Sequence, residues 1–423
     1  MIFNKKNSFK DKKKNKEGLL VKIKNFFNKK IFRNKSKFSF KETVLFMVIT
    51  LVFGILIGGI IMYGHGGFSG HGSNELNEFA RTYNDILNNY YQEVDADELL
   101  ESGLSGMIRY LGDPYAAYIT KEESKDFNET IEGEYCGIGA EIIYTPSDGI
   151  TKIGTIFEGS PAQKAGLKEG DILKAVNGES IENKTTSEIA EIVKGKKGTK
   201  VTIKVLREEQ EINFTIKRDT VDIPSVESNT YEENDKKIGY ISLSIFAENT
   251  DEQLKKELDK LENDNIDSLI IDLRGNTGGY LTSVTNIISM FTEKGTDIYQ
   301  LKTKEKVEVV KDKTKEHRTY PVTVLVNGSS ASASEVLAAA LKENYGATVM
   351  GTKTYGKGKV QKSYTLSNGS MVKYTHQEWL TPNGNSIDGV GVEPDIEVLY
   401  EYDDTKEVDN QLMAAIKEIS QKQ

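Results

Sequence analysis

The sequence of 423 residues predicts an α/β core in its C-terminal half, preceded by a smaller domain of β-strands and by a helical region. From residue 221 to 400, buried strands alternate with helix-forming segments, which is typical of an α/β core. Residues 129–219 contain short alternating strands, turn glycines and two short helical segments. They predict a β-sandwich-like domain inserted before the core.

The elements of the predicted core follow one another in a regular order. A strand at 237–243 opens the core, and an amphipathic helix follows at 252–261. Further strands are expected near residues 269, 323, 348 and 371. After the core, apolar residues at helical spacing predict a terminal helix within residues 401–423.

The N-terminal segment predicts a membrane anchor. Residues 1–41 hold 15 Lys or Arg against two acidic residues, so residues 1–42 form a basic segment. Residues 43–63 are 21 residues without a charge, about 31 Å long as a helix, which is enough to span a bilayer once. The positive-inside rule places the basic segment in the cytoplasm and all later residues on the extracytoplasmic side of the cell membrane. A cleaved signal peptide is the alternative, but no small-x-small site follows residue 63.

Two further units separate this anchor from the domains. Residues 64–73 are rich in Gly, His and Ser and predict a flexible linker. Residues 74–128 predict a helical region, because apolar side chains recur at helical spacing in two runs. Such apolar faces need a surface to pack against.

Composition excludes several classes of protein. The net charge is −9 although the first 41 residues are basic, so the remainder is strongly acidic and is not expected to bind nucleic acid. The single cysteine, Cys136, forbids an intramolecular disulfide. No His-Glu-x-x-His motif occurs, and we expect neither a metal site nor a cofactor. The Lys/Asn/Ile-rich composition fits a bacterial exported protein.

A serine lies at the point where a strand gives way to a helix. Ser332 lies in the run Ser-Ala-Ser-Ala-Ser-Glu, between the apolar segment 322–328 and the helix-forming segment 335–341. At the start of a helix, backbone N–H groups are unpaired and the helix dipole is positive. This position suits a nucleophile whose product is an oxyanion.

Lys357 is the candidate base for this serine. A lysine acts as a base only when it is neutral, and burial can lower its pKa enough. Gln361 follows four residues later, about 13 Å away in a straight strand, so both reach one serine only if the chain bends, which Gly358 allows. A Ser332/His376 pair is the main chemical alternative, because His376 follows an alternating strand-like run.

These motifs resemble the carboxyl-terminal processing peptidases, the tail-specific proteases of peptidase family S41, whose core is of the ClpP/crotonase-like type. The resemblance implies Ser332 as nucleophile, Lys357 as general base and Gln361 as the residue that orients the lysine. The segment Asp-Leu-Arg-Gly-Asn-Thr-Gly-Gly at 272–279 also fits, although many members have Asn-Pro in place of Asn-Thr. By the same resemblance, the backbone N–H groups of Gly278 and Ala333 form the oxyanion hole.

Residues 129–219 resemble a PDZ domain, a peptide-binding module. Glycines in the segment Tyr-Cys-Gly-Ile-Gly at 135–139 expose backbone N–H groups that can hold a terminal carboxylate. Aliphatic side chains would form the walls of the groove and favour apolar chain ends. The residues expected to bind peptide are Gly137, Ile138, Gly139, Ile142 and Ile189.

Together these features predict a membrane-anchored serine endopeptidase that binds free, apolar protein C-termini and removes C-terminal segments of exported proteins. The resemblance also implies that the helical region packs on the core or mediates a homodimer. A protein of another class is the alternative: a membrane-tethered PDZ adaptor whose protease-like core is catalytically inert.

Overall fold

The computed structural model describes residues 49–51, 53–54, 73–147, 149–401 and 409–422. The predicted basic segment at 1–42 and most of the predicted anchor and linker lie outside these residues. Among the helices that are described, none combines the length and the apolar character needed to cross a membrane.

The chain forms two units, divided after Ala96. The first unit contains helix α3, Ser73–Asn89, and the Tyr83 hydroxyl donates a hydrogen bond to the backbone oxygen of Ala96, 2.8 Å away. The second unit begins with most of α4, Ala96–Tyr110, and continues through α5, Lys121–Glu132. Helix α5 begins with a capping box between Thr120 and Glu123.

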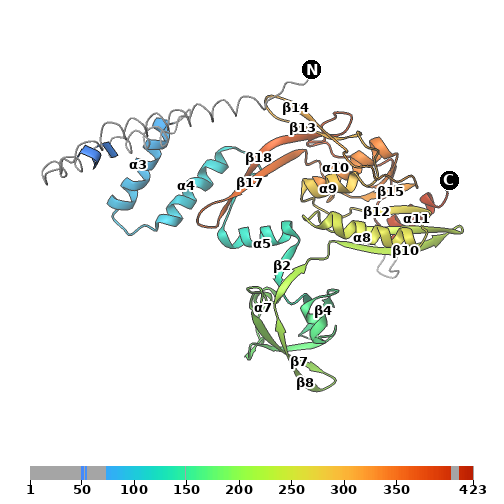
Figure 1. Ribbon diagram of the computed structural model, residues 1–423, viewed down its shortest axis with the longest axis horizontal. Helices are drawn as coiled ribbons and strands as arrows, with labels where there is room; N and C mark the ends of the chain where they lie inside the picture. The colour runs from blue at the N-terminus through green and yellow to red at the C-terminus, as the bar shows by residue number, and fades with distance from the viewer. Residues whose placement is uncertain (1–48, 52, 55–72, 148, 402–408, 423) are drawn as a thin grey trace, which may run out of the picture. The chain divides into compact units, whose positions relative to one another are not determined.

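The core of the second unit is a six-stranded sheet (Figure 1). Its order is β10-β11-β12-β15-β16-β19; β10 pairs antiparallel with β11, and the other neighbours are parallel. The strands are β10 (Val226–Glu233), β11 (Lys236–Leu243), β12 (Ser268–Asp272), β15 (Val322–Val326), β16 (Thr348–Gly351) and β19 (Ile396–Glu397). Every residue of β12 and β15 is buried, as expected for parallel strands covered on both faces.

Helices cover both faces of this sheet. Side chains of a strand point alternately to the two faces, and here they pack into two separate apolar clusters, each of which includes helix residues. Ile271 packs with the helices on one face, and Ile270 packs with the C-terminal helix on the other. The first face carries α8 (Thr250–Asn263), α9 (Leu281–Ile288) and α10 (Ala333–Ala340), and the second carries α11 (Asn410–Ile419). The predicted alternation of strands and helices is present.

A second, antiparallel sheet contributes the remaining strands of the core region (Figure 1). Strand β18 lies between β1 and β13, and the hairpin partner β17 also pairs with β18. The strands are β1 (Ala117–Ile119), β13 (Asp297–Lys302), β14 (Val307–Lys311), β17 (Lys359–Thr365) and β18 (Met371–Leu380). Sequence patterns did not separate this sheet from the parallel one.

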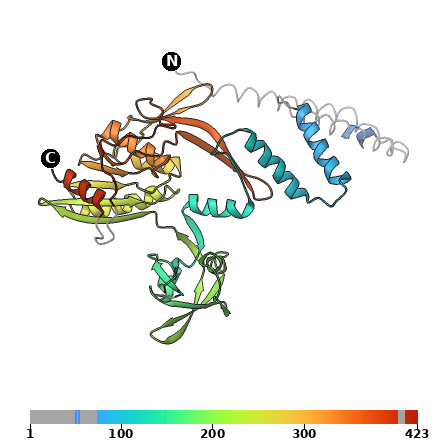
Figure 2. The same ribbon diagram turned by 180° about the vertical axis from the view of Figure 1, so that it is seen from behind.

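The smaller β domain is inserted between α5 and β10, and β2 and β9 pair where the chain enters and leaves it (Figures 1 and 2). Its sheet has the order β3-β4-β5-β7-β8, with β6 paired to β5. The elements are β2 (Glu134–Gly137), β3 (Ala140–Thr145), β4 (Ile150–Ile156), α6 (Pro161–Ala165), β5 (Ile172–Val176), β6 (Glu179–Ser180), α7 (Thr186–Val193), β7 (Lys200–Arg207), β8 (Gln210–Lys217) and β9 (Asp219–Asp222). Aliphatic side chains from both helices and the sheet fill its own core.

Candidate active site

Ser332 lies immediately before α10, just beyond the end of β15. Its backbone has φ 55° and ψ −114°, a conformation that costs free energy in any residue with a side chain. The side chain is half-buried, whereas its neighbours Ala331 and Ala333 are buried. A strained serine at a helix start is thus presented to an open space beside unpaired N–H groups.

A buried glutamate holds this turn in place. Glu335 is 0% exposed, and its Oε2 accepts hydrogen bonds from the backbone N–H groups of Ser332 and Lys357, both at 2.8 Å. Its Oε1 accepts from the Gly356 N–H at 2.7 Å and from the Thr354 hydroxyl at 2.6 Å. Sequence reasoning named Glu335 only as part of the serine run and missed this role, although its spacing from Ser332 is that of a capping box.

Lys357 lies between β16 and β17, and hydrogen bonds hold both its backbone N–H and its backbone carbonyl. Besides the bond to Glu335, its carbonyl accepts from the indole Nε1 of Trp379 at 3.0 Å. Its Nζ lies 5.0 Å from the centre of the Tyr115 ring, a cation–π distance. The lysine side chain therefore reaches a largely buried, partly aromatic environment.

This environment shifts the protonation equilibrium of Lys357 toward the neutral amine. Burial lowers the pKa of Lys357, and the positive charge of Lys373 acts in the same direction. The carboxylates of Glu335 and Asp113 oppose the shift without cancelling it. A lysine with a lowered pKa is what a general base requires.

The glycine turn at 275–279 lies directly against the serine. A Cβ placed on Gly278 would come within 2.8 Å of Ser332 Cβ and 3.0 Å of the Ala333 nitrogen. The N–H of Ala333 has no hydrogen-bond acceptor among the described residues. The N–H of Gly278 donates to Asn276 Oδ1 at 2.9 Å, so an oxyanion would have to share or replace that acceptor.

Asn276 connects this turn to the serine segment. It is 0% exposed, and its Nδ2 donates to the Leu243 carbonyl at 2.9 Å. Its own carbonyl accepts from the Ala331 N–H at 3.1 Å and from the Ser334 hydroxyl at 2.8 Å. Sequence reasoning did not single out this residue, because its partners come from distant segments.

A cleft of about 530 Å³ brings the predicted catalytic residues together. The residues expected from the sequence that line it are Gly278, Ser332, Ala333, Lys357 and Gln361. Side chains of α5, the glycine turn, β17 and β18 complete its walls. Segments far apart in the sequence, such as those of Gly278 and Ser332, thus meet in one hollow.

Two expected contacts are not formed between these residues. In the described part of the chain, Lys357 Nζ makes no hydrogen bond with Ser332 or Gln361. The amide of Gln361 instead donates to the Lys359 carbonyl at 3.2 Å and to Thr375 Oγ1 at 3.4 Å. The orienting role of Gln361 stays a prediction.

His376 lies away from the cleft. It is exposed and does not line the hollow that contains Ser332. The register of β17 and β18 shifts at this point, since Val360 pairs with Gln377 and Gln361 with Thr375. His376 is the extra residue of this bulge, which sequence alternation could not show.

The described residues contain no cluster of three or more His, Cys, Asp or Glu side chains able to hold a metal ion.

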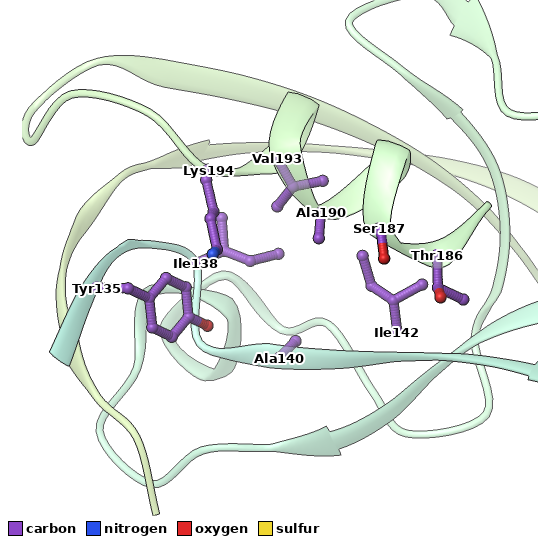
Figure 3. A pocket seen from close by; sticks show the side chains of 9 residues that line it. All are labelled: Tyr135, Ile138, Ala140, Ile142, Thr186, Ser187, Ala190, Val193 and Lys194. Atoms are coloured by element: carbon purple, nitrogen blue, oxygen red, sulfur yellow. The ribbon is translucent and has the colours of Figure 1, made fainter. Parts of the chain in front are cut away.

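The smaller domain carries a groove of about 260 Å³ between β3 and α7 (Figure 3). Its lining residues are Tyr135, Ile138, Ala140, Ile142, Thr186, Ser187, Ala190, Val193 and Lys194. Gly139, at φ 74°, makes the turn into β3, and Gly137 ends β2. Neither of these predicted peptide-binding glycines is among the residues that line the groove. Ile189 is 0% exposed and lies in the domain core, so Ala190 and Val193 form the helical wall in its place.

The cation Lys194 lies at one end of the groove, beside Ile138 (Figure 3). Lys194 Nζ is 5.6 Å from the centre of the Tyr135 ring and 2.7 Å from Glu129 Oε2 of α5. An apolar groove with a cation at one end suits a peptide that ends in a carboxylate.

The fold and the sites define a serine peptidase that carries a PDZ domain. Family profiles match peptidase family S41 at residues 237–398, a PDZ domain at 153–207 and the N-terminal domain of the activating protease CtpB at 65–123. The chain belongs to peptidase family S41, as the serine and lysine motifs predicted.

Two sequence relatives support this assignment. A probable CtpA-like serine protease of Staphylococcus aureus (strain COL) is 37% identical over 354 residues, which cover 83% of this chain and 69% of the relative. A protein with the same description from Staphylococcus epidermidis (strain ATCC 12228) is also 37% identical, over 84% of this chain and 71% of the relative. The solved structure of a photosystem II D1 C-terminal processing protease is 25% identical, with a TM-score of 0.45 over 78% of this chain and 88% of that one.

Proposed function

We propose that this protein is a membrane-anchored serine endopeptidase that removes C-terminal segments from exported proteins by means of a Ser332/Lys357 dyad. The observation that carries the proposal is the cleft in which Ser332, the Ala333 N–H and Lys357 meet. The lowered pKa of Lys357, caused first by burial, supports its role as a base. The proposed membrane anchor is inferred from the uncharged segment at 43–63 and the basic residues before it. With this anchor, both domains would lie outside the cytoplasm.

The chemistry is acyl transfer. Neutral Lys357 takes the hydroxyl proton of Ser332 as Oγ bonds to the scissile carbonyl carbon. The resulting oxyanion accepts hydrogen bonds from the N–H groups of Ala333 and Gly278, the latter released from or shared with Asn276. Collapse breaks the peptide bond, and Lys357 returns the proton to the leaving amine. A water molecule then attacks the acyl-enzyme, with Lys357 again as base, and frees the acid and Ser332.

Two details of the dyad must change or tighten for this reaction. Lys357 Nζ and Ser332 Oγ have to come within hydrogen-bond distance, a contact that often forms only when substrate is bound. Gln361 would then exchange its bond to Thr375 for one to Lys357, which would orient the amine.

The groove of the smaller domain supplies selectivity for chain ends. A free carboxylate would sit at the loop of Gly137, Ile138 and Gly139, near Lys194, and the last apolar side chains would pack on Ile142 and Val193. A protease that holds its substrate by the terminus cuts close to that terminus. The dimer implied by the helical region belongs to the same proposal.

The test compares the intact protein with its Ser332→Ala variant on a peptide that has a free, apolar C-terminus. Cleavage by the parent and none by the variant is expected. Turnover retained by the variant would remove Ser332 from the mechanism. An inactive parent that still binds the peptide would identify an inert adaptor instead. Equal binding of a matched peptide with an amidated C-terminus would contradict the recognition of chain ends.

A further inference from the structure

The Lys, Arg, Asp and Glu side chains that line the active-site cleft are all lysines. They are Lys357, Lys359 and Lys373, and no Asp or Glu contributes to the lining. The whole chain, by contrast, has a net charge of −9. A basic hollow in an acidic protein concentrates negatively charged groups of a substrate near the nucleophile.

Two of these lysines are already accounted for. Lys359 is neutralised by Asp388, 3.0 Å away, with Glu378 at 3.9 Å. Lys357 has the role of the neutral base. Lys373 is therefore the cation of the cleft that the enzyme itself does not neutralise: no carboxylate of the described residues lies within 4.0 Å of its amine.

Lys373 is held where a substrate can reach it. It lies on β18 between two neighbours, opposite Ala117 of β1 and Ser363 of β17. Its Nζ lies 5.4 Å from the centre of the Phe127 ring of α5, which also lines the cleft. The strand and the ring restrain the side chain, so little entropy is lost when it binds a partner.

We propose that Lys373 binds a carboxylate of the substrate inside the active-site cleft, so that the enzyme favours substrates with an acidic group near the scissile bond. This inference rests on the proposed peptidase function and names a part of its substrate specificity. A half-buried ammonium that has no carboxylate partner among the described residues gains a charge-assisted hydrogen bond from such a group. The carboxylate is either an Asp or Glu side chain or the α-carboxylate of a short departing segment.

The experiment separates these two sources. In the first arm, peptides that share one free, apolar C-terminus far from the cleaved bond carry Asp or Asn in turn at each position within four residues of that bond. We expect at least one position at which Asp raises kcat/KM about tenfold over Asn, the strength of one charge-assisted bond. In the second arm, the Asn peptides are compared with free and with amidated C-termini at increasing distance from the cleaved bond.

Variants assign the preference to the residue. Lys373→Gln should bring the Asp-to-Asn ratio, or the free-to-amidated ratio at one short distance, close to one. Lys373→Arg should retain it. Lys362→Gln is the matched control, because Lys362 lies on β17, is exposed and does not line the cleft. A ratio within one peptide pair is insensitive to any general effect of Lys373 on Lys357, since both peptides meet the same base.

Two results would overturn the inference: ratios below twofold in the parent at every position in both arms, or a preference that Lys373→Gln leaves intact. If the parent cleaves no peptide, the proposed function fails, and the inference is judged by binding. The affinity of Ser332→Ala for the Asp and Asn peptides should then differ about tenfold, and the double variant with Lys373→Gln should bind both equally. Equal affinities in Ser332→Ala would refute the role of Lys373.

Discussion

The carboxylate oxygen Oε2 of Glu335 accepts hydrogen bonds from the backbone N–H groups of Ser332 and Lys357 at the same distance, 2.8 Å. One buried side chain therefore fixes the main chain of the proposed nucleophile and of the proposed base. The loops that carry Ser332 and Lys357 do not have to be rigid by themselves, because the Glu335 carboxylate holds both of them. The relative position of the two loops depends on this carboxylate.

Replacing Glu335 by Gln should disturb both loops. The amide group of glutamine would direct N–H donors at backbone N–H groups that need an acceptor. We expect a loss of about 1–3 kcal/mol in the free energy of unfolding, measured by chemical denaturation. We also expect kcat to fall about 100-fold, because small displacements of reacting groups are costly. Glu308→Gln, an exposed residue of β14, is the control; equal effects of the two changes would contradict the bridging role.

The pH dependence of activity should report Lys357. Burial, followed by the charge of Lys373, lowers the pKa of Lys357 below the ordinary value of lysine. Because the base is the neutral amine, kcat/KM should be high above this lowered pKa and should fall as the pH decreases through it. Lys373→Met removes one cause of the shift, so the acidic limb of the profile should move to higher pH. A limb that stays in place, or moves to lower pH, would contradict this coupling.

Gly278→Ala tests the space next to the serine. The added Cβ would lie 2.8 Å from the Ala331 carbonyl oxygen and 3.0 Å from the Ala333 nitrogen, where an oxyanion would be bound. We expect kcat to fall about 100-fold or more, the cost of losing one oxyanion donor. Gly275→Ala is the matched control, because it has φ 76° but its Cβ would meet nothing within 4 Å. Similar losses in both variants would point to backbone strain instead of a blocked oxyanion site.

Arg274, which directly precedes the glycine turn, connects that turn to the C-terminal helix α11. Its guanidinium donates to Asp409 at the start of α11, at 2.9 and 2.6 Å, and to Asp272 of β12 at 2.6 Å. We expect Asp409→Asn to reduce the free energy of unfolding by about 1.5–3 kcal/mol at neutral pH. Asp259→Asn, in an exposed ion pair with Lys255, is the control and should cost little.

The pH dependence of this difference has a defined sign. Burial opposes ionisation of Asp409, but the hydrogen bonds from Arg274 outweigh it and lower the pKa of Asp409. The stabilisation is therefore complete above the unfolded-state pKa and is lost as the pH falls through the lower folded-state pKa. Denaturation of the parent and of Asp409→Asn should give converging stabilities in acid. A difference that grows on acidification would exclude the proposed ion pair.

Much of the core was predictable from the sequence, because local patterns carry the information. Apolar runs such as 268–272 and 322–326 predicted buried strands of an α/β core, and the serine run that follows residue 328 predicted the candidate nucleophile. The antiparallel sheet was harder, because β17 and β18 follow no simple alternation where the register shifts near His376. A bulge of this kind reverses which side chains face a site.

The sequence by itself determined the family and the order of the elements, and it singled out Ser332 and Lys357 as the candidate nucleophile and base, because motifs lie along a continuous stretch of chain. Only the tertiary structure decided that Glu335 bridges the two loops, that Asn276 joins the glycine turn to the serine segment, and that Lys373 shares the cleft. Their partners lie on other strands or loops. Several segments that are distant in the sequence together set how deeply a residue is buried and which charges surround it. A local sequence pattern therefore cannot predict either property.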